Sequence, residues 1–308
     1  MPQTHQQDSS RNLVHSLNAI GSSRVQIGNT YNTSHHYQKD AQQDCTKVLE
    51  YLGSTDPRED KIRIQQTSGG LLKDCYAWII DNPEFLAWRD QDRETRLLWV
   101  KGDPGKGKTM LLCGIIDELH PSTKLNDPKN RISLAYFFCQ ATNSGLNNAA
   151  SVLRGLAYLL VLQQPHLLSH FDGIQQRPTT HSNAWVAIQK RFLEVMADPA
   201  LRETYFIVDA LDECVENLDL LMEIISNPSS RVKWIISSRK CCDIEETLGN
   251  EQERYGLSLE LNQSLISQAV KNYIDYRIER MKNRKKLEHD VVEHISMGGI
   301  GMPTVGKK

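Results

Sequence analysis

One octapeptide of the sequence carries glycine, lysine and threonine at a spacing suited to holding a phosphate chain. Residues 102–109 match the pattern G-x-x-x-x-G-K-[ST] at every fixed position. The glycines let backbone N–H groups turn toward phosphate oxygens, and the N-terminus of the following helix adds a positive dipole end. Lys108 would reach the β- and γ-phosphates, and the Thr109 hydroxyl would ligate Mg²⁺. The predicted nucleotide-binding residues of this loop are Gly102, Asp103, Pro104, Gly105, Lys106, Gly107, Lys108 and Thr109.

A second group of candidate residues is acidic and follows an apolar run. Asp209 follows the apolar residues 205–208, and Asp212 and Glu213 lie three and four residues further on. A strand with this ending places a carboxylate at the C-terminal edge of a parallel sheet, where Asp209 would hold Mg²⁺. Either Glu213 or Asp212 could orient or polarise an attacking water. Arg239 follows the apolar run 232–237, where it could contact a γ-phosphate.

The elements that must position these groups alternate along the chain. Helical periodicity covers residues 39–52, 71–79 and 146–164 and resumes after residue 262, whereas residues 53–60 have the Gly, Pro and Asp content of a loop. Continuous apolar strands between helices predict an α/β fold, with a parallel sheet covered on both faces. The five predicted strands are 97–100, 132–139, 205–208, 232–237 and 257–261.

Composition excludes several classes of protein. The chain has 308 residues with 36 Lys and Arg against 38 Asp and Glu, so its charge is close to balanced. This balance argues against a nucleic-acid binder, and no apolar run reaches the roughly 18 residues of a membrane helix. The 7 cysteines form no C-x-x-C pair. We therefore expect a reduced, cytoplasmic protein that neither binds nucleic acid nor inserts into membranes.

Taken together, these motifs resemble the NACHT family of signalling NTPases, in particular the NLR-like proteins of filamentous fungi. The resemblance is carried by GDPGKGKT after RLLWVK, by DALDE at 209–213 and by WIISSR at 234–239. It implies a P-loop NTPase fold with the phosphate-binding strand central in a five-stranded sheet. It also implies a switch, in which ADP holds a closed form and ATP exchange permits self-association. The phosphate, magnesium, water and sensor positions of that family are matched here by Lys108, Thr109, Asp209, Asp212, Glu213 and Arg239.

The first forty residues have a different character. They are polar, and on composition alone they are typical of a solvated, disordered tail. The stretch NLVHSLNAIGSSRVQIGNTY nevertheless resembles the amyloid-forming repeat of the fungal HET-s prion. The best-matching positions of this amyloid motif are Arg24, Val25, Ile27, Gly28 and Asn29. In that family the clustered motifs fold into a β-solenoid that converts an effector protein carrying matching repeats.

These observations predict four segments and leave three functions open. The segments are a tail at 1–38, a helical flank at 39–95, a NACHT core at 96–262 and a helical segment at 263–308 that stops before any winged helix or repeats. The first function is a switch that binds ATP or ADP with Mg²⁺ (GTP is possible), self-associates and templates an effector. The second is a turnover ATPase with an inert tail, and the third is a truncated amyloid-motif decoy.

Overall fold

The structure is a computed structural model that describes residues 45–53, 56–90, 96–174, 181–240, 242–248, 255–259 and 262–283. The chain divides into two units, Met1–Thr46 and Lys47–Lys308. The sheet and the helices α3 to α11 belong to the second unit. The amyloid motif at residues 24–29 and the other residues of the predicted tail lie outside the described residues.

A five-stranded parallel sheet forms the centre of this unit, which confirms the predicted α/β class. Its order is β2-β3-β4-β1-β5. The strands are β1 (Leu97–Lys101), β2 (Ser133–Phe138), β3 (Thr204–Asp209), β4 (Val232–Ser238) and β5 (Tyr255–Ser258). The prediction that the phosphate-binding strand is central was wrong. The chain crosses from β1 to the far edge and returns through β3, so β4 becomes the middle strand and separates β1 from β3.

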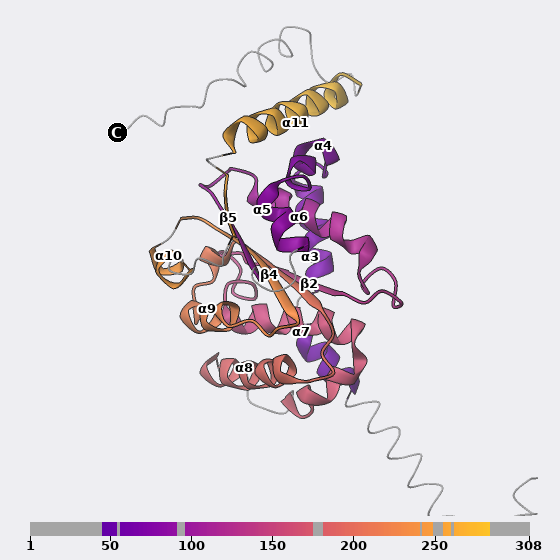
Figure 1. The fold of residues 1–308 in the computed structure, drawn as a ribbon, viewed down its shortest axis with the longest axis vertical. Coiled ribbons are helices and arrows are strands. Elements are labelled where there is room, and N and C mark those ends of the chain that lie inside the picture. Colours follow the sequence, from indigo (N-terminus) through magenta and orange to yellow (C-terminus); the bar gives the residue numbers. More distant parts are fainter. Residues whose placement is uncertain are drawn as a thin grey trace, which may run out of the picture. The chain divides into compact units, whose positions relative to one another are not determined.

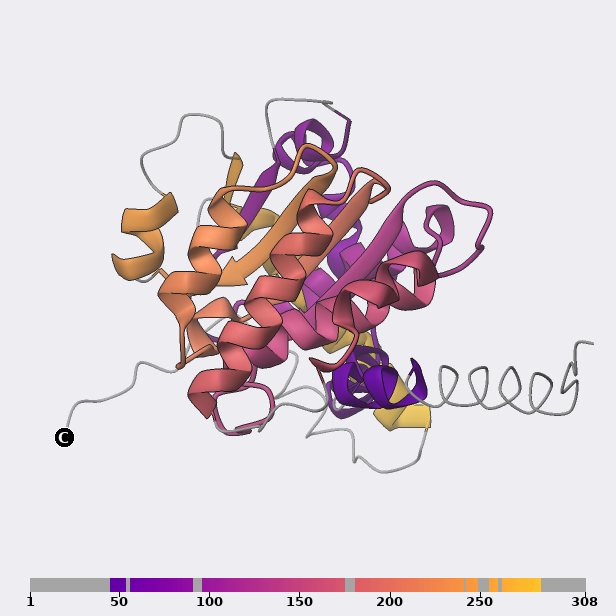
Figure 2. The ribbon, with the colours of Figure 1, turned by 90° about the horizontal axis from the view of Figure 1, so that it is seen from below.

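Helices cover both faces of the sheet. Figure 1 shows α3 (Pro57–Thr67), α5 (Pro83–Asp90) and α6 (Lys108–Leu119) on one face, and α7 (Ala149–Gln163), α8 (His181–Ala197) and α9 (Leu218–Ser226) on the other. Figure 2 shows α8 and α9 lying along the second face. The direction of travel across the sheet reverses after β2, so right-handed crossovers put α6, which precedes β2, and the helices that follow β2 on opposite faces. Other α-helices of the described residues are α4 (Lys73–Tyr76), α10 (Cys242–Leu248) and α11 (Gln263–Asn283), and residues 45–52 are also helical.

The core explains why the strands read as unbroken apolar runs. Every residue of β2, β3 and β4 is buried, because each strand is covered on both faces. Phe206 of β3 packs on Trp234 of β4 and on Phe192 of α8, with ring centroids 4.7 and 5.6 Å apart. Trp88 of α5 packs on Tyr205, on the opposite face of the same strand. These contacts bind both helical layers to the sheet.

The structure corrects several boundaries. The predicted loop 53–60 already contains the start of α3, because Asp56 accepts a hydrogen bond from the Arg58 N–H and Pro57 takes the first helical position, where its missing N–H costs nothing. The helix predicted at 71–79 is a short α4 followed by a 3₁₀ turn, Ala77–Ile79. Strand β5 covers residues 255–258, so it begins two residues earlier and ends three residues earlier than the predicted strand 257–261. Helices α8, α9 and α10 were not predicted.

No helix among the described residues is both long enough and apolar enough to cross a membrane.

Candidate functional site

The loop between β1 and α6 forms an open cradle of backbone N–H groups. Gly105 and Gly107 have φ of 77° and 82°, a left-handed conformation that favours glycine, and no atom lies within 4 Å of where a Cβ would stand on either. Gly107 is the N-cap of α6 and supplies no side-chain acceptor. The first N–H groups of a helix have no partner within it, so this uncapped end can donate to phosphate oxygens.

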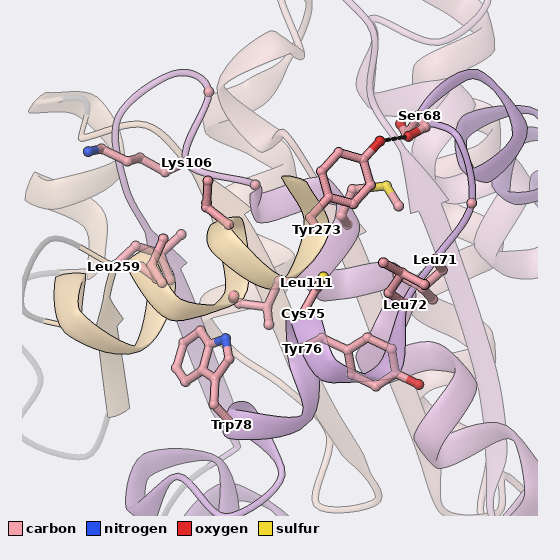
Figure 3. Close-up of a pocket in the computed structure, with 17 residues that line it drawn as sticks. Ser68, Leu71, Leu72, Cys75, Tyr76, Trp78, Lys106, Leu111, Leu259 and Tyr273 are labelled. Atoms are coloured by element: carbon pink, nitrogen blue, oxygen red, sulfur yellow. Dashed lines mark hydrogen bonds between the residues drawn. The ribbon is translucent and has the colours of Figure 1, made fainter. Parts of the chain in front are cut away.

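The two lysines of the loop are placed differently. The Lys108 Nζ donates to the carbonyl oxygens of Gly102 and Asp103, at 2.5 and 3.1 Å. Its ammonium therefore lies over the cradle, where phosphate oxygens could replace these carbonyls as acceptors. Figure 3 shows the Lys106 side chain pointing away from the other labelled residues. Of the two, Lys108 is the one aimed at a phosphate chain.

Asp209 lies at the end of β3 and is only 2% exposed. Its Oδ1 accepts a hydrogen bond from the Ser237 hydroxyl at 2.5 Å, and Thr109 of α6 lies close enough to its carboxylate to help lower its pKa. Burial raises the pKa of Asp209, and the Ser237 hydrogen bond, the nearby Thr109 and the charge of Lys108 oppose that rise. Thr109 and Asp209 therefore lie close together, although β4 separates β1, which precedes the Thr109 helix, from the Asp209 strand β3.

These residues fit a nucleotide carrying Mg²⁺. The described residues include no group of three or more His, Cys, Asp or Glu that could hold a metal ion by itself. Mg²⁺ ordinarily needs no such cage, because it takes one or two protein oxygens and completes its shell with phosphate oxygens and water. Thr109 and Asp209 would be its protein ligands, beside a cradle open to the phosphates. When bound, the ion would neutralise charge on the phosphate oxygens.

Asp212 and Arg239 form an ion pair at the same edge of the sheet. The Asp212 carboxylate accepts from the Arg239 backbone N–H at 2.9 Å and from its Nε at 2.5 Å. The Asp212 side chain is 7% exposed, whereas that of Arg239 is 54% exposed. Both predicted site residues are therefore brought together, but the contact uses both oxygens of the carboxylate. This arrangement favours a role for Asp212 in holding Arg239 rather than in polarising water.

Glu213 is held from the other side. Its Oε2 accepts a hydrogen bond from the Ala141 backbone N–H at 2.9 Å, just beyond the end of β2. The connection between Asp209 and these acids passes through Ala210, whose φ of 53° is unusual for a residue other than glycine. That turn sends the chain back across the edge of the sheet. It leaves Glu213, of the two acids, as the candidate for orienting water.

A pocket of about 400 Å³ opens beside the cradle (Figure 3). Three segments far apart in the sequence line it: the phosphate loop with the start of α6, residues 68–78, and α11 together with Leu259, which directly follows β5. Most of its lining is apolar, which suits the flat faces of a nucleobase. The lining residues are Ser68, Gly70, Leu71, Leu72, Cys75, Tyr76, Trp78, Gly105, Lys106, Gly107, Met110, Leu111, Leu259, Ile266, Ala269, Val270 and Tyr273.

Two polar contacts hold α11 against the 68–70 loop and close one side of the pocket. The Tyr273 hydroxyl donates to the Ser68 carbonyl, and an Arg280 N–H donates to the Gly69 carbonyl at 3.3 Å. No sequence motif pointed to Tyr273, because its partner is a backbone carbonyl more than two hundred residues away. The pocket wall therefore depends on contacts that local patterns do not encode.

Replacing Tyr273 with phenylalanine should weaken nucleotide binding about 3- to 10-fold, chiefly through faster release. The change removes one hydrogen bond, worth about 1 kcal/mol net, from the contact that holds the pocket wall. Stopped-flow release of a fluorescent nucleotide measures the rate. Tyr276→Phe, on an exposed position of the same helix, is the matched control. Equal release rates for the two variants would show that the contact does not hold the pocket closed.

Two family profiles match the sequence. The family described as "Nephrocystin 3, N-terminal" matches residues 74–239, a range that runs from α4 through the phosphate loop to Arg239. The family described as "N-terminal small S protein of HET, non-prionic" matches residues 12–33. The first match covers more than half of the chain. The second lies within the predicted tail.

Individual proteins add one strong similarity and two weak ones. The chain is 49% identical over 251 residues to the vegetative incompatibility protein HET-E-1 of Podospora anserina, covering 79% of this chain and 18% of that protein. Cdc6p of Pyrobaculum aerophilum has a TM-score of 0.37 at 14% identity, covering 64% of this chain and 49% of its own. The ORC2 protein of Aeropyrum pernix has a TM-score of 0.34 at 13% identity, covering 74% and 68%. Both structural similarities are too weak to indicate a function.

The chain thus spans less than a fifth of the length of its curated relative. The profile match and the parallel sheet with its phosphate loop nevertheless agree over the same residues. The chain belongs to the nephrocystin 3 N-terminal family and is a NACHT-type P-loop protein related to a fungal incompatibility protein.

Proposed function

We propose that this chain is a nucleotide-gated signalling switch of fungal incompatibility or innate immunity, which binds ATP with Mg²⁺ and then self-associates. The observation that carries the proposal is the open glycine cradle with the Lys108 ammonium over it. Phosphates would bind the cradle and Lys108, with Mg²⁺ on Thr109 and Asp209 and Arg239 near the γ-phosphate. ADP would hold the resting form, and slow hydrolysis would return the switch to it.

The nucleobase would occupy the apolar pocket beside the cradle. Its walls come from the phosphate loop and from α11, so a bound base would touch both. Residues 96–262 would then form the NACHT core, with flanks at 39–95 and 263–308 supplying the rest of the pocket. We propose ATP as the ligand, and competition between ATP and GTP for the same site measures the preference directly.

The output of the switch would be the N-terminal segment. We propose that self-association clusters residues 1–38, that the motif Arg24, Val25, Ile27, Gly28 and Asn29 then forms cross-β structure, and that this structure templates an effector with matching repeats. High local concentration favours such stacking, because an isolated copy cannot bury its apolar stripe. The description of the family matched at residues 12–33 speaks of a non-prionic protein. Fibril formation therefore needs its own measurement.

One experiment on the full chain tests both halves of the proposal. With ATP and Mg²⁺ we expect a larger assembly by size-exclusion chromatography with light scattering, together with thioflavin fluorescence; with ADP we expect neither. Ile27→Asp is the matched control, because a charge in the motif should block stacking without touching the nucleotide site. That variant should assemble and give no thioflavin signal. Assembly that is identical in ATP and ADP would contradict the switch.

A turnover ATPase is the second candidate, and the placement of Glu213 favours it. A carboxylate held by one backbone N–H at the edge of the site is suited to orienting water. Turnover in the common enzymatic range, about 1–10³ s⁻¹, would support this reading, and a rate orders of magnitude lower would support the switch. If the chain bound no nucleotide, both of these functions would be excluded, and the third one, a truncated amyloid-motif decoy, would remain.

A further inference from the structure

Ser237 occupies the place in the sheet where the two halves of the phosphate site must be joined. β4 lies between the phosphate-loop strand β1 and the Asp209 strand β3. Ser237 pairs with Val100 of β1 on one side. On the other side the pairing of β3 with β4 runs to Val208 and Ile236, so Asp209 and Ser237 are the next residues in register. Ser237 is fully buried.

The Ser237 hydroxyl makes two hydrogen bonds at this point. It donates to Asp209 Oδ1 at 2.5 Å, and its oxygen accepts from the Ala210 N–H at 2.9 Å. The first bond orients the Asp209 carboxylate, which lies close to Thr109. The second holds Ala210 in its left-handed conformation, which an alanine adopts only when its surroundings impose it. One hydroxyl therefore supports both the carboxylate and the turn that leads to Asp212 and Glu213.

The neighbouring serine provides a comparison within the same strand. Ser238 is equally buried, but side chains alternate along a strand, so it faces the opposite side of the sheet. Its hydroxyl accepts from the Trp99 indole N–H at 2.8 Å and donates to the Arg239 carbonyl. Ser238 therefore holds the sheet together without contacting Asp209. The relevant difference between the two serines is that Ser237 contacts the Asp209 carboxylate and Ser238 does not.

We propose that Ser237 is a positioning residue for Mg²⁺ in the nucleotide site, acting by fixing the Asp209 carboxylate and the Ala210 turn. The inference rests on the proposed function, because it assumes that Asp209 meets the ion of a bound nucleotide. Without the hydroxyl, Asp209 Oδ1 loses a buried donor and the Ala210 N–H loses its acceptor. The carboxylate is then free to turn away from the metal position. Nucleotide binding without Mg²⁺, which uses the cradle and Lys108, is not affected.

The test titrates free Mg²⁺ into the full chain with a fluorescent nucleotide. Ser237→Ala should need about 10–100-fold more Mg²⁺ for the half-maximal effect, the usual loss when a group supporting a metal ligand is removed. Its nucleotide affinity in EDTA should equal that of the unchanged protein. Ser238→Ala should match the unchanged protein in both measurements. A merely structural role for Ser237 would instead lower the affinity equally with and without Mg²⁺.

The outcomes separate this inference from the proposed function. If the unchanged protein binds nucleotide but shows no Mg²⁺ effect, or binds none, the proposed function fails and the inference falls with it. If the unchanged protein responds to Mg²⁺ and Ser237→Ala responds identically, the inference alone is overturned. Should Ser237→Ala not fold, Ser237→Cys keeps nearly the same size with a much weaker donor. A Mg²⁺ requirement raised in that variant supports the inference, and an unchanged one overturns it.

Discussion

Replacing Lys108 with alanine should reduce the affinity of the chain for ATP with Mg²⁺ by on the order of 10²–10⁴-fold. A hydrogen bond to a charged group contributes about 1.5–3 kcal/mol, and a lysine over the cradle would make two of them to the phosphates. The free protein should stay folded, because the Lys108 side chain is hydrogen-bonded to two carbonyls of its own loop; its loss also removes a positive charge that lowers the pKa of Asp209. Isothermal titration calorimetry measures the affinity, and thermal unfolding without nucleotide checks the fold.

Lys106→Ala is the matched variant for this measurement. It removes the same kind of side chain from the same loop, but Lys106 points away from the other labelled residues of the pocket (Figure 3). We expect a loss of less than about tenfold, because its charge acts at a distance and through solvent. Two variants with equal losses would mean that the loop binds phosphate only through its general positive charge. A Lys108→Ala protein that still bound and assembled normally would contradict the proposed function.

The phosphate loop could be predicted because its chemistry is local. Two glycines, a lysine and a threonine at fixed spacing specify a cradle whatever surrounds it, and Gly105 and Gly107 have the left-handed φ that such a loop uses. The strands could be predicted for a similar reason, since burial on both faces leaves a continuous apolar run. The strand order could not. It depends on which edge each crossover reaches, and β4 rather than β1 became the middle strand.

The contacts within the site were beyond the reach of sequence patterns. Asp212 and Arg239 are 27 residues apart. Nothing in the sequence around either residue shows that the Asp212 carboxylate accepts hydrogen bonds from both the backbone and the side chain of Arg239. Ser237 is one of two serines at the end of a strand, and only the direction of the pleat decides which one meets Asp209. The pocket needs three separate segments. Its Tyr273 contact ends on a carbonyl, which any residue in place of Ser68 would also supply.

Replacing Glu213 with glutamine should lower ATP hydrolysis by on the order of 10²–10⁴-fold and leave ATP binding nearly unchanged. A glutamine oxygen can still accept the Ala141 N–H, so the side chain keeps its place and loses only its charge and basicity. Single-turnover hydrolysis of bound ATP measures the effect separately from affinity. If the chain is a switch, this variant should remain assembled in ATP for longer than the unchanged protein.

Asp212→Asn distinguishes the two acids. An asparagine keeps an oxygen for the Arg239 N–H but loses the charge that pairs with its guanidinium, so the variant should mainly disturb Arg239. We expect it to change the ratio of ATP to ADP affinity more than it changes the hydrolysis of bound ATP, because Arg239 would meet the γ-phosphate that ADP lacks. The opposite pattern, with hydrolysis lost in Asp212→Asn and kept in Glu213→Gln, would exchange the two roles. Hydrolysis of bound ATP therefore reports on Glu213, and the ratio of ATP to ADP affinity reports on Asp212. Together the two measurements assign a role to each acid.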